Sequence, residues 1–186
     1  MNNVPVDVTG VVLETPRLLL RPWRPEDAQD LYAYASVDGV GQMAGWTPHT
    51  SLEESRRIVE RFISEKRTFA LELRQTHRVI GSLGLERIGA DLGQPYSDLP
   101  GREIGYVLSK DYWGQGLMPE AVRAALDYCF STLGCTFVQC SHFPDNHQSR
   151  RVIEKCGFTY ISTMVLPTPT GGRTLRVYVR MRPETL

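Results

Sequence analysis

The chain has 186 residues, with 21 Lys and Arg balanced by 21 Asp and Glu, so its formal net charge is zero. This balance gives no overall field that would attract nucleic acid or an anionic membrane. No apolar run approaches the roughly 20 residues that cross a bilayer, and the first residues lack the basic and apolar regions of a signal peptide. We expect a single domain over residues 1–186, with its core from about 11 to 183, in the cytoplasm and without a nucleic-acid or membrane partner.

The cysteines and histidines show no spacing typical of a metal site. The cysteines lie among apolar neighbours, as reduced core thiols do. We therefore expect no metal ion at Cys129, Cys135, Cys140 and Cys156 or at His49, His77, His142 and His147.

The first half of the chain predicts a strand, two helices and a hairpin. Pro25-Glu-Asp suits a first helical turn, and Ser51-Leu-Glu-Glu is a capping box that starts a second helix. Residues 38–50, between the helices, are rich in glycine and form a loop. In chain order we expect a strand at 17–23, helices from 25 through 35 and from 51 through 62, and paired strands at 68–74 and 78–86.

The second half alternates strands and helices after a mobile surface loop at 89–101. Apolar residues at steps of three and four from Met118 to Leu133 indicate a long helix, which Gly134 ends. In chain order we expect a strand at 103–109, this helix, a strand at 136–143, a short helix at about 146–156, and strands near 158–166 and 173–182 joined by a turn at 168–172.

This order mixes hairpins with helical crossovers, so the sheet should be partly antiparallel and partly parallel. We predict an α+β fold in which seven strands form one central mixed α/β sheet with helices on both faces.

The segment from Glu103 to Met118 predicts a strand that ends in a glycine turn and runs directly into the long helix. The first turn of a helix has backbone N–H groups without partners and is partly positive, so it binds anions. Gly114 and Gly116 remove Cβ atoms that would block close approach, and Pro119 fits a first helical turn. An ordinary strand–turn–helix connection has the same features, so this segment alone does not distinguish an anion site from a plain connection. The rest of the chain has to distinguish them.

Two other nucleotide sites are excluded by sequence. A dinucleotide fingerprint would need a third glycine where Pro119 stands and an acidic residue at the end of the next strand, and neither is present. A phosphate loop would need a Gly-Lys-Ser/Thr triplet, which the chain lacks.

A second cluster, Asn146-His-Gln-Ser149 with Arg150 and Arg151, follows the next strand. Asn146 precedes a helix, so capping that helix is its alternative role. Both clusters lie at the carboxyl ends of successive parallel strands, where α/β sheets place ligands.

Together these motifs resemble the GCN5-related N-acetyltransferase (GNAT) family, and within it the RimJ/RimL-like branch that acetylates protein N-termini and small amines. The matching motifs follow one another along nearly the whole chain. They are Thr15-Pro-Arg-Leu-Leu-Leu-Arg-Pro, Pro25-Glu-Asp-Ala, Glu103-Ile-Gly-Tyr-Val-Leu, Tyr112-Trp-Gly-Gln-Gly-Leu-Met-Pro-Glu-Ala, Asn146-x-x-Ser149 and Lys155-Cys-Gly-Phe.

The resemblance implies acetyl-CoA bound where the strands at 103–109 and 136–142 splay apart, with CoA as a product. Backbone groups of Val107 and Leu108 would hold the pantetheine arm, and Asn146 would hydrogen-bond the cofactor. Lys155, Arg150 or Arg151 would meet the ribose phosphate; their alternative is an ordinary solvated helix face. The pyrophosphate would bind the backbone amides of Trp113, Gly114, Gln115, Gly116, Leu117 and Met118.

Amine acetylation needs a deprotonated nitrogen, and an α-amine (pKa about 7.7–8.0) loses its proton more easily than a lysine (pKa about 10.4). Glu103, at the entrance of the strand at 103–109, is the first candidate for a general base that contacts the substrate amine, directly or through water. Its alternative is a solvent-exposed acid at a strand end. His142 is a second candidate, and the backbone N–H of Val107 would stabilise the oxyanion.

Three positions depart from the wider family. Ile153 stands where many members carry a tyrosine that assists the leaving thiolate, which leaves the hydroxyl of Ser149 to polarise it. Trp113 and Met118 replace the first and last residues of the cofactor signature, as RimJ/RimL-like members tolerate. Residues 163–174 contain no acid, whereas relatives in this branch can carry a glutamate base there.

The acceptor site should lie between the 38–50 loop, the 89–101 loop and the last hairpin turn. Met43, Trp46 and His49 would line it together with Glu103, or would only pack the first loop onto the core. Three functions remain open: acetylation of a protein or peptide N-terminal α-amine, acetylation of a small amine such as an amino acid, polyamine or antibiotic, and a non-catalytic acyl-CoA-binding module. A homodimer is compatible with the sequence, which does not decide the oligomeric state.

Overall fold

A computed structural model of the protein describes residues 2–89, 92–168 and 171–183. Within them, nine strands form one mixed sheet in the order β2-β3-β4-β5-β6-β7-β9-β8, and β1 pairs with β6 outside this order. The strands are β1 (Asn2–Asn3), β2 (Leu13–Glu14), β3 (Leu18–Pro22), β4 (Thr68–Leu73), β5 (Arg78–Glu86), β6 (Pro100–Leu108), β7 (Phe137–His142), β8 (Thr159–Thr168) and β9 (Gly171–Met181); the helices are α1 (Ala28–Ala35), α2 (Leu52–Glu65), α3 (Leu117–Ser131) and α4 (His147–Lys155).

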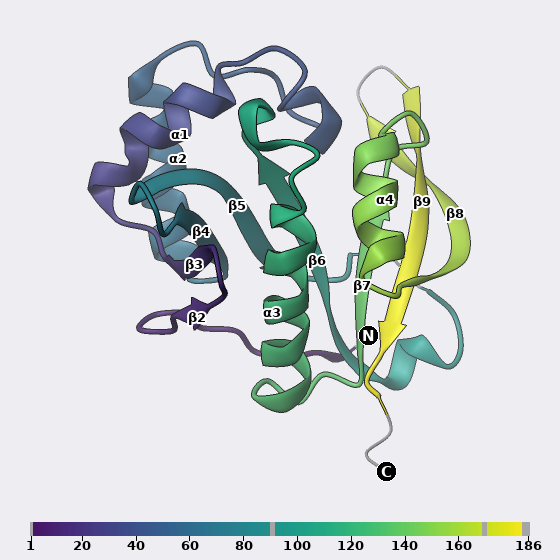
Figure 1. Ribbon diagram of the computed structural model, residues 1–186. Coiled ribbons are helices and arrows are strands. Elements are labelled where there is room, and N and C mark those ends of the chain that lie inside the picture. Colours follow the sequence, from purple (N-terminus) through teal and green to yellow (C-terminus); the bar gives the residue numbers. More distant parts are fainter. Residues whose placement is uncertain (1, 90–91, 169–170, 184–186) are drawn as a thin grey trace.

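The helices cover both faces of the sheet, with α1 and α2 on one face and α3 and α4 on the other (Figure 1). Strand periodicity explains this arrangement, because successive side chains point to opposite faces. In β4, Phe69 and Leu71 belong to the apolar core that includes α3, whereas Ala70 between them packs with α1 and α2. The predicted α+β fold with a central mixed sheet is confirmed.

The sheet opens between β6 and β7. Strands β3 to β6 pair in antiparallel fashion, and β6 then pairs in parallel with β7. That parallel pairing ends at Ile104 and Cys140, although β6 continues to Leu108. The last residues of β6 therefore border a gap in the sheet.

The structure differs from the predicted elements mainly at short strands. The seven predicted strands correspond to β3–β9, and β1 and β2 are additional strands of two residues each. Two residues are too few for a periodic pattern, so only their pairing with β6 and β3 reveals them. The end of the predicted 89–101 loop belongs to β6, because Pro100 and Gly101 pair with β1. In the predicted turn at 168–172, residues 169–170 lie outside the described residues.

A buried cluster of charges ties α1 to the sheet. Arg21 on β3 binds Asp27 through two hydrogen bonds of 2.8 Å and Glu72 on β4 through its Nε at 2.5 Å. The three side chains are 9% exposed or less, and His77 also contacts Glu72 at 3.1 Å. Each buried charge thus has a partner, as burial requires.

The four cysteines are buried free thiols. Within the described part of the chain, no helix is long and apolar enough to span a membrane.

Candidate active site

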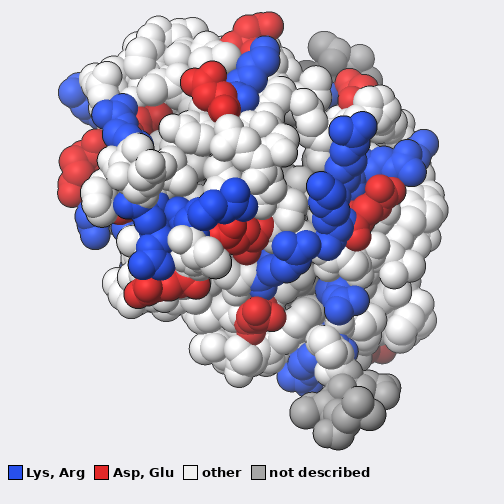
Figure 2. Space-filling model, in the orientation of Figure 1, with Lys and Arg blue, Asp and Glu red and all other residues white. Residues whose placement is uncertain are grey.

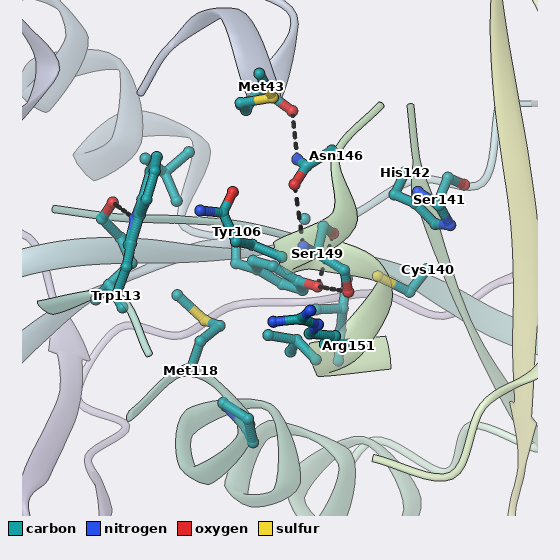
Figure 3. A pocket seen from close by; sticks show the side chains of 18 of the residues that line it. Met43, Tyr106, Trp113, Met118, Cys140, Ser141, His142, Asn146, Ser149 and Arg151 are labelled. Atoms are coloured by element: carbon teal, nitrogen blue, oxygen red, sulfur yellow. Dashed lines mark hydrogen bonds between the residues drawn. The ribbon is translucent and has the colours of Figure 1, made fainter. Parts of the chain in front are cut away.

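A cavity of about 440 Å³ lies where β6 and β7 separate. Its walls come from these strands, the loop before α3, helix α4 and residues Val40, Met43 and Ala44 of the 38–50 loop. In Figure 3, Trp113 and Met118 lie toward one end and Ser141 and His142 toward the other, with Tyr106 and Ser149 between them. The two clusters singled out from the sequence therefore line one cavity.

The pairing of β5 with β6 decides which backbone groups face this cavity. Ser109 donates its N–H to Ile80 on β5, and the register pairs Val107 with Ser82 two residues away. Because antiparallel ladders alternate, the N–H and C=O of Val107 also point toward β5. The groups of Tyr106 and Leu108 point into the gap instead. The role predicted for the Val107 N–H thus does not fit the register, although the Val107 side chain lines the cavity.

The glycine turn before α3 has the geometry expected of an anion cradle. Gly114 and Gly116 both have φ of 77°, a left-handed conformation that glycine adopts without strain, and Gly116 is the N-cap of α3. Pro119 is buried in the first turn, as predicted. Five of the six residues predicted to hold the pyrophosphate line the cavity: Trp113, Gly114, Gly116, Leu117 and Met118. Gln115 does not, and its side chain donates to the Asp111 carbonyl oxygen.

The indole of Trp113 is fixed beside the cradle. Its Nε1–H donates to the Leu108 carbonyl oxygen at 2.9 Å, so one backbone acceptor facing the gap is already used. The Tyr106 backbone groups and the Leu108 N–H remain on the cavity side for a bound ligand.

Arg17 braces the cradle, a role the sequence motifs did not reveal. Its guanidinium donates to the Gln115 carbonyl oxygen at 2.9 Å and pairs with Glu120 at 2.7 Å. Thr15 also donates to Glu120, at 2.6 Å. The motif containing Thr15 and Arg17 therefore holds the first turn of α3 in place, which only its long-range contacts show.

Asn146 and Ser149 join α4 to the rest of the site. The Asn146 Oδ1 accepts from the Ser149 N–H at 3.0 Å and caps α4, while its Nδ2 donates to the Met43 carbonyl oxygen at 3.0 Å (Figure 3). The capping role considered for Asn146 is thus present. Its hydrogen bond to a cofactor stays a prediction, for which the amide has a second Nδ2 hydrogen.

Tyr106 was not singled out from the sequence. Its hydroxyl lies 2.9 Å from the Ser149 Oγ and 3.2 Å from the Ser149 carbonyl oxygen (Figure 3). The alternation of side chains along a strand could have indicated it, because Tyr106 lies on the same face of the strand as Ile104 and Leu108.

Cations gather over α4 on the face shown in Figure 2. Of the three proposed for the ribose phosphate, Arg151 and Lys155 line the cavity. Arg150 does not; it forms an ion pair with Glu154 at 2.8 Å. The solvated-face alternative therefore fits Arg150 best.

Glu103 lies at the cavity wall and pairs with Gln139 on β7, one residue before the β6–β7 pairing ends. Its Oε1 accepts from the Ser141 Oγ at 3.0 Å. Burial raises the pKa of this carboxyl above its ordinary value, and the nearby Glu86 charge adds to the effect, while hydrogen bonds from Ser141 and Gln139 oppose it. Within the described chain it forms no ion pair. It is a partly buried carboxylate rather than the solvent-exposed acid considered as its alternative.

His142, the second base candidate, is engaged on both sides of its ring. Its Nδ1 lies 2.8 Å from the Phe143 carbonyl oxygen and its Nε2 lies 3.4 Å from the Tyr178 hydroxyl. Burial lowers its pKa. His142 is only 3% exposed, so it is less accessible than the partly buried Glu103.

Of the residues expected around the acceptor, Met43 lines the cavity, but Trp46 and His49 do not. Their rings lie 5.2 Å apart, and the His49 Nδ1 is 2.8 Å from the Ser55 Oγ on α2. Both side chains pack the loop onto the helical layer, which is the alternative considered for them. Among the described residues, no group of His, Cys, Asp and Glu is placed to hold a metal ion.

Residues 17–159 match the acetyltransferase (GNAT) domain family. The chain is 32% identical over 152 residues to the N-acetyltransferase YoaA of Bacillus subtilis (strain 168), covering 79% of this chain and 82% of that protein. It is 28% identical over 172 residues to the N-acetyltransferase p20 of Bacillus licheniformis, covering 90% and 93%.

Solved structures share the fold. A GNAT-family acetyltransferase from Bacillus anthracis superimposes with a TM-score of 0.80 at 21% identity, over 92% of this chain and 98% of that one. Ribosomal-protein-S5-alanine acetyltransferase from Vibrio fischeri gives 0.71 at 19% identity, over 94% and 98%. RimJ of Mycobacterium smegmatis, solved with CoA-disulfide, gives 0.70 at 21% identity, over 88% and 81%. The chain therefore belongs to the GNAT family and is an acetyl-CoA-dependent N-acetyltransferase.

Proposed function

We propose that the protein acetylates the N-terminal α-amine of a protein or peptide, with Glu103 as its general base. The observation that carries the proposal is the partly buried Glu103 carboxyl near the open end of the β6–β7 pairing, which is hydrogen-bonded to Ser141 and has no cation beside it. Its raised pKa brings it closer to that of an α-amine, and proton transfer is most efficient when the two approach each other. A lysine amine would be a poorer match.

The residues around the cavity suit the acetyl donor. Residues at the start of α3 line the cavity, where their N–H groups would bind the pyrophosphate, and the Tyr106 and Leu108 backbone edge would bind the pantetheine arm. Arg151 and Lys155 offer positive charge to the ribose phosphate. These groups lie on the α3 and α4 side of the sheet, whereas Glu103 and Ser141 would receive the amine from the other side.

In the proposed reaction, Glu103 accepts a proton from the amine, whose nitrogen attacks the thioester carbonyl carbon. The oxyanion would be stabilised by a gap-facing backbone N–H, that of Tyr106 or Leu108 in place of Val107. Collapse breaks the carbon–sulfur bond, and Ser149 donates a hydrogen bond to the departing sulfur. The acetyl group thus becomes an amide, and CoA leaves.

Two features support a peptide acceptor. The acceptor side of the cavity includes the apolar side chains of Val40, Met43, Phe143 and Leu175, which suit the first side chain of a peptide. The V. fischeri neighbour carries the name of an enzyme that acts on an alanine of a ribosomal protein.

A small amine is the second candidate. The FsC-acetyl coenzyme A-N(2)-transacetylase of Aspergillus fumigatus, whose name mentions no protein acceptor, is 36% identical to this chain over 72 residues. Those residues cover only 38% of this chain, so the peptide acceptor is preferred.

The test uses the full chain with acetyl-CoA and three sets of acceptors: peptides that start with alanine or serine, the same peptides with a blocked N-terminus and an internal lysine, and small amines. CoA thiol release and product mass are measured, with a reaction lacking acceptor as the control for hydrolysis. We expect turnover of the free peptides only, with the acetyl group on the α-amine. Faster turnover of a small amine, with free peptides at the hydrolysis rate, would overturn the peptide assignment.

A further inference from the structure

Two hydroxyl groups from opposite walls meet inside the cavity. Tyr106 comes from β6 and Ser149 from α4, and their oxygens lie 2.9 Å apart. Figure 3 shows the Tyr106 side chain reaching across from the strand to the helix. Both residues line the cavity between the anion cradle and Glu103, which is the stretch that the thioester end of the donor must pass.

Helix α4 itself supplies no phenol to this place. Ile153 is 1% exposed and packs in the apolar core with Val122 and Phe158. The Tyr106 ring instead brings a phenol into the cavity from the neighbouring strand.

The two hydroxyls have one proton each and three possible acceptors. In one arrangement Tyr106 donates to the Ser149 carbonyl oxygen at 3.2 Å, and Ser149 donates to the Tyr106 oxygen. In the other, Tyr106 donates to the Ser149 Oγ, which leaves the Ser149 proton free to point into the cavity. Only the second arrangement offers a hydrogen-bond donor to a ligand.

We propose that Tyr106 is a positioning residue that donates its hydroxyl hydrogen bond to the Ser149 Oγ and thereby turns the Ser149 proton onto the sulfur of the thioester. The inference rests on the proposed acetyl transfer and assigns the leaving-group step to this pair. It also explains how a lone serine can serve where the helix lacks a tyrosine.

No proton needs to leave Tyr106. Burial raises the pKa of this phenol well above its usual value, whereas a thiol loses its proton near pH ~8.5. When the carbon–sulfur bond breaks, its electron pair stays on sulfur, and the thiolate accepts the hydrogen bond from Ser149. The amine proton passes to Glu103 and then to water, and water later protonates the released thiolate, so the protons balance.

The first test needs no acceptor. CoA is bound to the full-length protein, and its thiol is titrated by the ultraviolet absorbance of the thiolate, with the complex of CoA lacking the thiol as the blank. A hydrogen bond onto sulfur should lower the pKa of the bound thiol by about one pH unit relative to free CoA. Ser149→Ala should abolish this shift, and Tyr106→Phe should remove most of it. Tyr160→Phe is the matched control, because the Tyr160 hydroxyl lies 2.8 Å from the Thr163 Oγ1 outside the cavity.

The second test is kinetic. Tyr106→Phe should lower kcat about tenfold with KM for acetyl-CoA within about twofold, and the double variant with Ser149→Ala should be no slower than Ser149→Ala alone. Multiplying losses, or a Tyr106→Phe variant that behaves like Tyr160→Phe in both tests, would overturn the inference. A wild-type thiol shift without turnover of any amine would instead overturn the proposed function and leave the hydrogen-bonded pair established.

Discussion

Two glutamates in the same sheet, the buried Glu72 and the partly buried Glu103, have opposite environments. Glu72 on β4 accepts from Arg21 at 2.5 Å and from His77 at 3.1 Å; burial alone would raise its pKa, but these partners lower it. Glu103 on β6 has a hydroxyl as its partner, and burial raises its pKa. The sheet continues on both sides of Glu72, whereas β6 and β7 separate one residue beyond Glu103. A buried carboxylate paired with a cation stabilises the structure, whereas a carboxylate that burial leaves without a cation is a candidate for the proposed base.

The largest effect is expected on stability, at the buried charge cluster around Glu72. Arg21→Met would leave Asp27 and Glu72 buried without their cation, so the free energy of unfolding should fall by about 3–5 kcal/mol. Urea denaturation measures the loss. Arg56→Met is the control, because Arg56 is 57% exposed and pairs with Glu53 at 3.5 Å, so its loss should stay within about 1 kcal/mol. Equal losses for both variants would show that Glu72 does not depend on its partner.

Glu103→Gln should have the reverse profile. We expect kcat to fall about 10²-fold at neutral pH, because the amide cannot accept the proton, with CoA affinity and stability nearly intact. Glu53→Gln on the exposed surface of α2 is the matched control for activity. An equal loss of kcat and CoA affinity would mean that Glu103 holds the site together instead of acting as its base.

Stability should also depend on pH with opposite signs at the two sites. Glu72 has a lowered pKa in the folded protein, so its contribution is present above the ordinary value of 4.5 and is lost as pH falls through the folded pKa. Glu103 has a raised pKa, so the folded state holds its proton more tightly, and stability falls as pH rises from 4.5 through the folded pKa.

The measurement is urea denaturation of wild type, Glu72→Gln and Glu103→Gln from about pH 3 to about pH 8. Relative to wild type, Glu72→Gln should be most harmful at the upper end, and Glu103→Gln most favourable there. In the wild type, kcat should fall at low pH as Glu103 becomes protonated, and Glu103→Gln should remove this fall. Parallel curves for the two variants would contradict the contrast between the sites.

Local patterns explain why much of the fold and the cradle could be predicted from sequence. The Ser51 N-cap of α2, the apolar face of α3 and the turn at Gly114 and Gly116 are each determined within a few residues, although the Glu54 side chain accepts from the Thr50 N–H and so does not complete the predicted capping box. Glu103 was singled out as a base at the entrance of its strand, but β6 begins at Pro100, and the burial of Glu103 depends on Ser141 and the sheet around it.

Contacts between distant residues could not be predicted in the same way. The orientation of Val107 depends on its register with Ser82, and one residue of slip would reverse it. Tyr106 and Ser149 are 43 positions apart and meet only because β6 and α4 are neighbours in space. From its place in an apolar loop, Trp46 could either line the acceptor site or pack the loop onto the core. In the structure its ring lies against His49 and packs the loop.

The smallest effect tests whether the contrast between paired and unpaired charges also holds for cations. In the described chain, Arg151 and Lys155 have no ion-pair partner and line the cavity, whereas Arg150 is paired with Glu154. Arg151→Gln or Lys155→Gln should raise KM for acetyl-CoA about fivefold at low salt, equivalent to ~1 kcal/mol, and less at high salt.

Arg150→Gln is the matched control on the same helix and should change KM by less than about twofold, because its charge is already neutralised by Glu154. Measuring the affinity for CoA and for dephospho-CoA, which lacks the ribose phosphate, locates the contact. A cation that meets this phosphate should lose its effect with dephospho-CoA, whereas one that acts on the pyrophosphate should keep it. If Arg150→Gln weakens CoA binding as much as the other two, the charge of the whole helix face attracts the donor, and pairing would not separate functional from structural charges on α4.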